Sequence, residues 1–489
     1  YNKLIIDFKY SLRMYQTVYI KYCKNCVMPD TKWENRLDET GICSACRYVE
    51  VKEKTDWEKR RAELKQIFEK YKSKDGSNYD CICPVSGGKD SHYITYVVTQ
   101  VFGLNPLLVS FRPTYRELTD VGRKNLENLK KTFNVDCLEF SPKPDVYRKI
   151  QKIALLELGD ASYPAHFCIF TIPVRAAVEK KIPLIVWGEN SQAEYGGPMD
   201  DQNKKYLDPV WLKKYGLSIK DAGHSDYNGP EFLRKHGIKE KDLIPYIYPS
   251  EKELQDVGVT GIFLGQFVKW DIFKQVELMK KWGFSVIDGK SEGTYTNFEN
   301  LDNKDQGLHD YLKWLKFGYG RTSDHASMEI RKKRLTREEG VELVRKFEGK
   351  IPNQYLDEYL KDFEMTRDEF LKAVDKFINK DLFKKDENGN LIRDSERNLE
   401  KINYDNIDLV ISALPHNIFH NVISSIPNNI KVIDMSADFR FTNYKIYNEY
   451  YETKHGSENL LKEAIYGLSE INRKDIKGAR IVACPGCYP

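Results

Sequence analysis

The feature that most constrains this chain is a glycine-containing loop between an apolar strand and a helix. Residues 79–85 (YDCICPV) have the composition of a short buried strand, and residues 92–102 have the pattern of a helix. Residues 86–91 (SGGKDS) lie directly between them. Two glycines allow a ligand to approach the backbone closely, and free N–H groups at the start of a helix favour an anion. The segment therefore predicts a phosphate-binding turn, with a plain strand–turn–helix corner as the alternative.

This loop does not follow the GxxxxGK[ST] pattern of P-loop nucleotide-binding proteins. It resembles the SGGxDS loop of the PP-loop ATP-pyrophosphatases, which cleave ATP between its α- and β-phosphates. The resemblance implies that Asp90 is a partner of Mg²⁺ and that Lys89 offsets phosphate charge. It assigns phosphate contacts to four residues: Ser86, Gly87, Gly88 and Ser91.

Strands and helices alternate on both sides of the loop. Residues 105–111, 135–140 and 182–187 have the composition of buried strands, and residues 51–73 and 119–133 have the apolar spacing of helices. Such alternation predicts a parallel sheet that holds its ligand at the carboxyl ends of the strands. We interpret three cysteines of these strands as small buried core residues: Cys81, Cys83 and Cys137.

Four cysteines near the N-terminus form one pattern. Cys23 and Cys26 make one CxxC pair, Cys43 and Cys46 make a second, and residues 27–42 separate the pairs. Two such pairs can place four thiolates around one ion, so we expect a structural zinc site in a ribbon of turns and short strands. Two disulfides are the alternative, which a cytosolic setting disfavours. A redox role is disfavoured because the pairs occur as a set.

Several longer stretches carry a more specific resemblance. They are KYCKNCVMPDT (21–31), GICSACRY (41–48), PVSGGKDS (84–91), IPLIVWGENSQAEYGGP (182–198), LGQFVKWDIFKQVE (264–277), SEGTYTNFENLD (291–302) and GYGRTSDHAS (318–327). Together they resemble the N-acetyl sugar amidotransferases of surface-polysaccharide and nonulosonic-acid biosynthesis. This resemblance covers about residues 20–394.

The resemblance implies a reaction and partners. ATP adenylates the amide oxygen of an acetamido sugar and releases pyrophosphate, and ammonia then displaces AMP to give an acetamidino sugar. Separate subunits similar to the glutaminase and cyclase of imidazole glycerol phosphate synthase supply the ammonia, since we identify no glutaminase in the chain. This chemistry needs a phosphate loop, magnesium, charge neutralisation at the α-phosphate and a sugar pocket.

Two further groups of polar residues are candidates for this site. Glu189 and Asn190 follow the strand at 182–187, where an α/β sheet places ligand-facing groups, so we assign them to the nucleotide or sugar site. An ordinary polar strand end is the alternative. In the segment after residue 318, Arg321 is a candidate phosphate clamp. His325 is a candidate for proton transfer with Asp324 orienting it, or a helix cap.

The character of the chain changes after residues 384–394 (KKDENGNLIRD), which predict a turn or linker. Residues 407–414 have the composition of a buried strand, and further motifs are KVIDMSADFR (431–440), AIYGLSEIN (464–472) and GARIVACPGCYP (478–489). They resemble N-acetyl-γ-glutamyl-phosphate reductase of arginine biosynthesis, over residues 395–489. The resemblance makes Cys487 the thioester-forming nucleophile.

The reductase-like piece lacks two parts of that family's catalytic apparatus. We find no glycine-rich NADP loop near residues 380–410, and the region after the nucleophile, with its catalytic histidine, is absent. We therefore expect the piece to be inactive, either as a fusion remnant or as a join between two genes. Because the chain begins with Tyr1 and ends with Pro489 inside a motif, we expect a fragment at both ends, with Met14 as a plausible start.

Bulk composition excludes several classes of protein. The formal net charge is only +4, which provides no global field for nucleic acid or an anionic membrane. We see no apolar stretch long enough for a transmembrane helix and no secretory signal, so a cytoplasmic enzyme is expected. A tRNA-thiolating PP-loop enzyme, the arginine-pathway reductase and a non-catalytic zinc-ribbon protein remain alternatives. Which sugar is modified, and the oligomeric state, are not readable from the sequence.

The predicted fold class is α/β. It consists of a parallel-sheet PP-loop domain of the adenine nucleotide α-hydrolase-like type, an N-terminal four-cysteine zinc ribbon and a C-terminal partial α/β reductase fragment. The expected domains are a leader over 1–20, the ribbon over 21–50, the PP-loop amidotransferase over 51–394 and the reductase fragment over 395–489.

Overall fold

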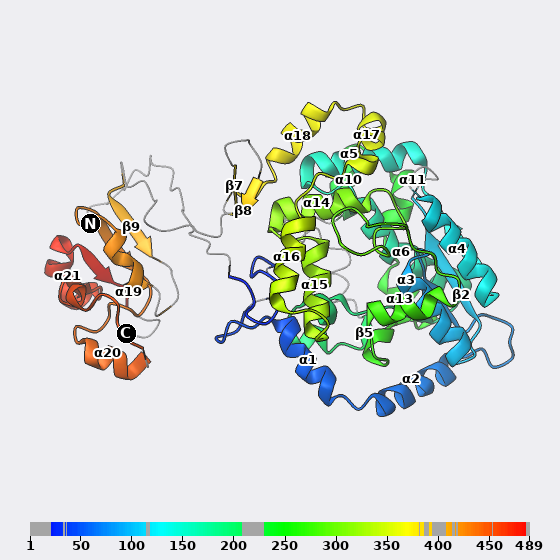
Figure 1. Ribbon diagram of the computed structural model, residues 1–489, viewed down its shortest axis with the longest axis horizontal. Helices are drawn as coiled ribbons and strands as arrows, with labels where there is room; N and C mark the ends of the chain where they lie inside the picture. The colour runs from blue at the N-terminus through cyan, green and yellow to red at the C-terminus, as the bar shows by residue number, and fades with distance from the viewer. Residues whose placement is uncertain are drawn as a thin grey trace. The chain divides into compact units, whose positions relative to one another are not determined.

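The computed structural model divides the chain into two compact units, each described here by itself (Figure 1). One unit comprises residues 20–393, and the other comprises residues 394–489 together with residues 1–19. The predicted leader over 1–20 and the predicted nucleophile Cys487 lie outside the described residues. The described residues are 21–32, 35, 37–113, 118–207, 229–380, 382–385, 391–393, 407–412, 416, 419–451 and 453–485.

The larger unit, 20–393, is built on a six-stranded sheet. Its strand order is β3-β2-β1-β4-β6-β5, in which β5 alone runs antiparallel to its neighbour. The prediction of an α/β fold with a parallel sheet is therefore confirmed, and the predicted strands all form. The strands are β1 (Cys81–Pro84), β2 (Pro106–Phe111), β3 (Cys137–Phe140), β4 (Leu184–Trp187), β5 (Tyr206–Leu207) and β6 (Thr260–Phe263).

The strand order contains a switch point beside β1. From β1 the chain passes outward through β2 to β3, and it then returns to the other side of β1 with β4. In sheets of this kind ligands bind in the crevice outside the carboxyl ends of the strands at such a point. The register pairs Ile82 with Ile185, so the residues four positions further along, Ser86 and Glu189, follow their strands at the same level.

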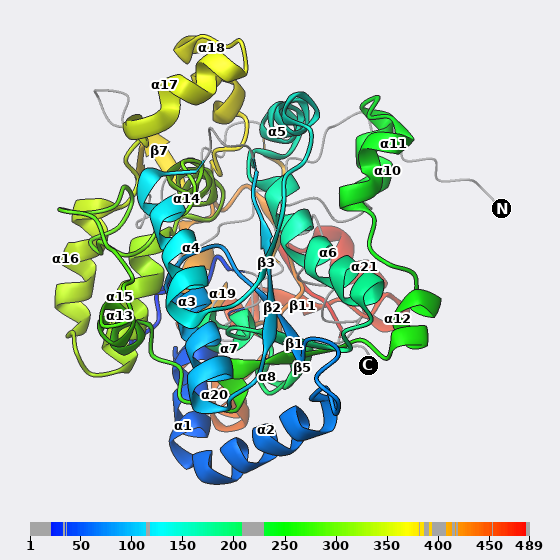
Figure 2. The same ribbon diagram turned by 90° about the vertical axis from the view of Figure 1, so that its right-hand side faces the viewer.

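Helices cover both faces of the sheet (Figure 2). α3 (Lys89–Tyr96), α4 (Asp120–Phe133) and α13 (Ile272–Lys280) contribute to one hydrophobic cluster. α5 (Pro144–Leu158) and α6 (Tyr163–Lys180) contribute to the cluster on the other face. Cys81 and Cys83 are buried in the first cluster while Ile82 is buried in the second, as the two-residue period of a strand requires.

The predicted helix over 51–73 is two helices, α1 (Ser44–Lys54) and α2 (Trp57–Tyr71). The break occurs because the Asp56 side chain accepts a hydrogen bond from the Lys59 N–H and caps a new helix. The other elements are η1 (Val97–Val101), α7 (Ser191–Tyr195), α8 (Met199–Gln202), α10 (Gly229–Lys235), α11 (Glu240–Leu243), η4 (Ile244–Tyr246), α12 (Glu251–Val257), η5 (Leu264–Gln266), α14 (Gln306–Phe317), α15 (Arg321–Arg331), α16 (Arg337–Phe347), α17 (Asn353–Asp362), α18 (Arg367–Asp375), β7 (Phe383–Lys385) and β8 (Leu391–Arg393).

The C-terminal unit contains a second, smaller parallel sheet with the order β11-β12-β10-β9. Its core includes Ile430, Val432 and Ile481. The predicted strand over 407–414 forms over the shorter span of β9. The elements are β9 (Leu409–Ser412), α19 (Phe419–Val422), η7 (Ile423–Ser425), β10 (Lys431–Asp434), α20 (Tyr444–Tyr451), η8 (Glu458–Lys462), β11 (Ala464–Tyr466), α21 (Ser469–Gly478) and β12 (Ile481–Ala483).

Among the described residues, no helix combines the length and the apolar composition that crossing a bilayer would require.

Candidate nucleotide site and cysteine cluster

The loop after β1 turns back on itself through hydrogen bonds between its main chain and two serine hydroxyls. The Ser91 Oγ accepts hydrogen bonds from the N–H of Ser86 (2.8 Å) and of Gly87 (3.3 Å). The Gly88 N–H donates to the Ser86 Oγ at 3.3 Å, and α3 begins at the next residue. Three main-chain donors of the loop therefore bond to serine hydroxyls beside the N-terminus of α3, a position where the helix dipole favours an anion such as phosphate.

Both glycines of the loop are closely packed, and the backbone conformation of Gly87 favours glycine. Gly87 has a φ of +102°, and a Cβ at this position would lie 3.1 Å from the main-chain oxygen of Gly122. A Cβ at Gly88 would lie 2.9 Å from the Asp302 Oδ2. The loop is thus pressed between α4 and the segment around Asp302, and only glycine fits without displacement.

Lys89 is the central cation of the site. It is 7% exposed, and its ammonium pairs with the Asp90 carboxylate at 2.8 Å and with the Glu299 carboxylate. Burial alone would lower the pKa of Lys89, but the two carboxylates raise it well above its usual range, so the side chain is charged. Lys89 and the His325 ring in turn hold the pKa of Glu299 well below its usual range, against the effect of burial.

Three carboxyl groups near Lys89, namely its partner Asp90 and two others, have raised pKa values. Burial, and then the nearby Asp90 carboxylate, raise the pKa of Glu189 to about 7. Burial and Glu299 raise the pKa of Asp302 to about 6, and burial also raises the pKa of Asp90. The Asp90 Oδ1 is buried without a hydrogen-bond partner. Carboxylate oxygens are the ligands that Mg²⁺ prefers, so Asp90, Glu189 and Asp302 offer the donor chemistry for that ion. Among the described residues their ligand atoms do not converge as closely as those of the four cysteines.

Residues 299–302 connect the phosphate loop to α14 and α15. Asn300 donates from its Nδ2 to the Asp310 Oδ2 on α14 at 2.8 Å. Asp310 in turn receives the Arg321 guanidinium of α15 in a bidentate pair, with Nε–Oδ2 at 3.2 Å and Nη2–Oδ1 at 3.1 Å. The main-chain oxygen of Asp302 accepts the N–H of Thr119 at the start of α4. Through these contacts residues 299–302 join the phosphate loop to α4, α14 and α15.

The structure places the three predicted residues of α15 in different surroundings. Arg321 is held by Asp310, as described above. Asp324 is buried and pairs with Lys313 at 2.7 Å, so the predicted orientation of His325 by Asp324 is wrong. His325 lies inside α15 rather than before it, which also excludes the predicted capping role.

His325 faces the phosphate-loop side through two other partners. Its Nδ1 lies 3.0 Å from the Thr294 Oγ1, and its Nε2 lies 3.5 Å from the Glu299 Oε1. His325 therefore reaches Lys89 through Glu299, by way of the segment 291–302.

Of the two predicted residues after β4, Glu189 alone lies in the carboxyl cluster. The Asn190 Oδ1 accepts the Gln192 N–H at 3.0 Å and caps α7, while its Nδ2 donates to the main-chain oxygen of Asp201 at 2.7 Å. The side-chain amide is thus used within the protein, which corrects the assignment of Asn190 to a ligand. It stabilises the turn that presents Glu189.

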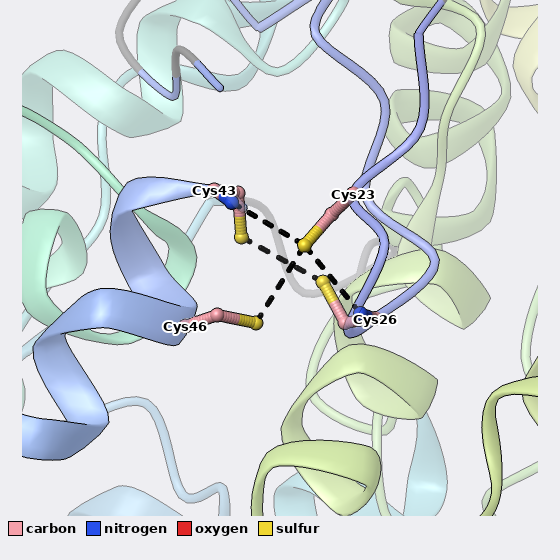
Figure 3. A group of neighbouring side chains, drawn as sticks. All are labelled: Cys23, Cys26, Cys43 and Cys46. Atoms are coloured by element: carbon pink, nitrogen blue, oxygen red, sulfur yellow. Dashed lines mark hydrogen bonds between the residues drawn. The ribbon is translucent and has the colours of Figure 1, made fainter. Parts of the chain in front are cut away.

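The four predicted zinc ligands converge, so this part of the prediction is confirmed (Figure 3). Their sulfur atoms lie within 4.8 Å of one another, with Cys23–Cys46 at 3.9 Å and Cys26–Cys43 at 3.7 Å. Four thiolates bound to zinc at about 2.3 Å in a tetrahedron are about 3.8 Å apart, so the set fits a tetrahedral ion. The cysteines are free, which excludes the two disulfides.

The surroundings of the Cys23 sulfur atom favour its thiolate form. The Cys23 Sγ accepts N–H groups from Asn25 (3.4 Å), Cys26 (3.5 Å) and Cys43 (3.3 Å). The local structure differs from the predicted ribbon. The first pair lies in a turn with isolated bridges, whereas Cys43 caps α1 and Cys46 lies in its first turn.

The cysteine cluster is packed against the helices that build the site. Its apolar neighbours include Tyr319, Ala326 and Ile330, at the start of and within α15. The Arg337 Nε donates to the main-chain oxygens of Cys23 (3.2 Å) and Cys26 (3.1 Å). A metal at this cluster would therefore fix the position of α15, which carries Arg321 and His325.

Several residues of the site escaped sequence reasoning. Glu299, Asn300 and Asp302 lie in a stretch that was recognised as a motif, but nothing in their spacing shows that they meet a loop some two hundred positions earlier. Asp310 carries no local signal at all. The contacts arise only when the strand order brings β1 beside β4 and the segment 291–302 folds back.

Two family matches divide the chain near the boundary between the units. Residues 292–396 match the family described as LPS biosynthesis protein WbpG-like, C-terminal domain. Residues 377–479 match the family described as semialdehyde dehydrogenase, NAD binding domain.

Curated relatives match the C-terminal part. An N-acetyl-gamma-glutamyl-phosphate reductase of Cereibacter sphaeroides is 45% identical over 89 residues, covering 18% of this chain and 26% of the relative. A probable chloroplastic reductase of the same name from Arabidopsis thaliana is 46% identical over 86 residues, covering 18% of this chain and 21% of the relative. The chain thus spans about a quarter of the length of these curated relatives.

Two solved structures are also similar, at a low level. One is the NH3-dependent NAD synthetase from Campylobacter jejuni, 15% identical with a TM-score of 0.24, covering 42% of this chain and 92% of that chain. The other is the U34-tRNA thiolase NcsA from Methanococcus maripaludis, 14% identical with a TM-score of 0.23, covering 69% and 93%. These likenesses are too slight to decide the fold or the function.

Proposed function

We propose that the larger unit is an ATP-dependent amidotransferase that converts an acetamido sugar to an acetamidino sugar, through an adenylated imidate, with release of AMP and pyrophosphate. The observation that carries the proposal is the ion pair between Lys89 of the SGGKDS loop and Glu299. Glu299 belongs to the segment 292–396, which matches a family of lipopolysaccharide biosynthesis proteins. A phosphate loop and a polysaccharide-related segment therefore share one site.

Each part of the site has a role in this reaction. The N–H groups of the loop and the charged Lys89 would bind and neutralise the phosphates, which stabilises charge that develops as the α–β bond breaks. Asp90, Glu189 and Asp302 would hold Mg²⁺, which supplies further neutralisation of the phosphates when bound. Arg321, fixed by Asp310, would orient the adenylated sugar.

Two other groups belong to the proposal. The four cysteines would bind a structural zinc ion and hold α15 in place. Ammonia would come from a partner glutaminase with a cyclase-like subunit, as the family resemblance implies.

The test is an assay of AMP and pyrophosphate with the full chain, ATP, Mg²⁺ and ammonium chloride. The panel contains N-acetylglucosamine, N-acetylmannosamine and their UDP-linked forms, with bulk tRNA as a separate arm. We expect AMP to form only with an acetamido sugar. AMP formation with tRNA and with no sugar would instead support the thiolation alternative.

The C-terminal unit matches N-acetyl-gamma-glutamyl-phosphate reductases at 45–46% identity over about a quarter of their length. We infer that this unit derives from a reductase of N-acetyl-γ-glutamyl phosphate, and we expect no reductase activity from it. The test is an assay of NADPH oxidation in the presence of that acyl phosphate. Oxidation that is lost in a Cys487→Ser variant would contradict this expectation.

A further inference from the structure

A second cluster of titratable side chains lies outside the phosphate loop, between α6 and α14. Asp160, just before α6, is buried, and its Oδ1 lies 3.1 Å from the His309 Nδ1. Its Oδ2 lies 3.9 Å from the His166 Nδ1. The two imidazole rings meet edge to face with centroids 4.9 Å apart. The reaction described above uses none of these three residues.

The charges in this cluster would orient His309 to act as a base, with Asp160 as the orienting carboxylate. Although burial opposes ionisation, the His309 and His166 rings lower the pKa of Asp160 below its usual range, so it is a carboxylate. A carboxylate at Nδ1 of His309 selects the tautomer with its proton on Nδ1 and its lone pair on Nε2.

Side-chain contacts and sequence neighbours together relate this pair to the phosphate loop. His309 is followed by Asp310, which holds Arg321 and accepts the side-chain amide of Asn300. Asn300 is preceded by Glu299, the partner of Lys89. Two side-chain contacts, Lys89–Glu299 and Asn300–Asp310, and two steps between sequence neighbours therefore separate Lys89 from His309. The histidines are also accessible, because the side chains of His309 and His166 are 22% and 47% exposed.

We propose that His309, oriented by Asp160, is the base for the second half of the reaction, in which an amine attacks the adenylated sugar. The C–N bond forms and the C–O bond to AMP breaks, with its electron pair remaining on the AMP phosphate oxygen. One proton leaves the attacking nitrogen for the His309 Nε2 and passes to solvent. The inference rests on the proposed amidotransferase function, since only that reaction supplies an amine nucleophile.

The experiment separates the two half-reactions in the full chain, with the sugar panel named above. Sugar-dependent exchange of labelled pyrophosphate into ATP measures adenylation without an amine. Amidine formation with ammonium chloride measures the attack. For His309→Gln and for Asp160→Asn we expect exchange within about twofold of the unaltered chain, while amidine formation falls by about 10²–10⁴-fold.

Two comparisons sharpen this result. Hydroxylamine is already unprotonated at neutral pH. When it replaces ammonium, the loss of product formation in both variants should therefore be smaller. His236→Gln is the matched control, because the His236 Nδ1 contacts the main-chain oxygen of Phe232 in the preceding helix α10, and this variant should change neither half-reaction.

The outcomes are distinguishable. If exchange and amidine formation fall together in both variants, or if neither changes, the His309 base is refuted while the amidotransferase function stands. If the unaltered chain shows no exchange with any sugar of the panel, the proposed function fails, and the role of His309 fails with it.

Discussion

The two units are both built on parallel sheets, but the polar residues that they bury differ in kind. In the larger unit Asp90, Glu189 and Asp302 have raised pKa values, because burial disfavours their charged forms and neighbouring carboxylates add to this effect. In the C-terminal unit the buried Asp438 accepts hydrogen bonds from the Tyr447 hydroxyl (2.9 Å) and the His420 N–H (3.1 Å).

The difference shows what a shared architecture leaves open. A parallel sheet fixes where ligand-facing residues lie, but the balance of buried charge decides whether a site is complete without a ligand. In the larger unit three carboxyl groups with raised pKa values lie near Lys89, whereas in the C-terminal unit burial and Asp438 raise the pKa of Asp434, whose carboxylate accepts hydrogen bonds from the Ser436 N–H and Oγ. Each prediction below changes one unit and uses the other, or a matched position, as its reference.

The largest effect is expected at the cysteine cluster. Cys26→Ser removes one of four metal ligands, and apparent zinc-binding free energies in small zinc domains are roughly 10–16 kcal/mol. Hydrogen exchange measured by mass spectrometry should accelerate in α1, α15 and α16 and stay unchanged in β9–β12. Metal analysis of the unaltered chain should find one zinc per chain.

The control for this variant is Cys137→Ser, at a partly exposed cysteine of β3 that lies outside the cluster. It should leave exchange in α15 unchanged. Unchanged exchange in Cys26→Ser as well would contradict the role of the cluster in holding α15.

The second effect concerns the phosphate loop. Lys89→Ala removes the cation and leaves the Glu299 carboxylate buried without it, so sugar-dependent AMP formation should fall by about 10²–10³-fold. Cys484→Ser in the C-terminal unit should change AMP formation by less than about twofold. Equal losses in the two variants would mean that the units do not act independently.

The third effect compares two glycines with positive φ. Gly87→Ala forces a Cβ to within 3.1 Å of the Gly122 main-chain oxygen, whereas a Cβ at Gly76 meets nothing within 4 Å. We expect Gly87→Ala to lower the free energy of unfolding by about 2–4 kcal/mol and Gly76→Ala by about 1–2 kcal/mol. Urea denaturation measures both, and equal losses would show that the loop is not tightly packed.

The smallest expected effect is a dependence of the free energy of unfolding on pH that arises from Glu189. Its pKa is raised from 4.5 to about 7 in the folded protein, so the protonated carboxyl stabilises the fold. This contribution is complete below pH 4.5 and is lost as the pH rises through about 7. Because Glu189 is partly exposed, we expect a loss of roughly 1–2 kcal/mol between pH 5 and pH 8 without Mg²⁺. Glu189→Gln should remove this part of the slope, and an unchanged slope would exclude Glu189 as its source.

Local patterns predicted the elements better than the contacts between them. The strand β1, the loop at 86–91 and the four cysteines each have a signal within a few neighbouring residues, and each forms where expected. The pairing of Asp324 with Lys313, and of His325 with Thr294, depends on how α14, α15 and the segment 291–302 pack. No short-range spacing encodes such packing.

The pairing of charged and polar groups in the site also could not be predicted from the sequence. The residue types at Glu189 and Asn190 predicted two ligand-facing groups, but Asn190 is consumed by the turn that it caps. Glu299 was part of a recognised motif, yet its importance lies in a partner from a distant strand end. The Asp160–His309 pair joins α14 to the connection between α5 and α6 and has no sequence signature.

The most direct test of the central claim is the fate of the acetamido oxygen. An acetamido sugar from the panel, labelled with ¹⁸O in its amide carbonyl, is incubated with the full chain, ATP, Mg²⁺ and ammonium, and the AMP is examined by mass spectrometry. Adenylation of the amide oxygen predicts one ¹⁸O atom in each AMP and an unlabelled amidine. AMP without the label, or ADP and phosphate as the products, would contradict the account.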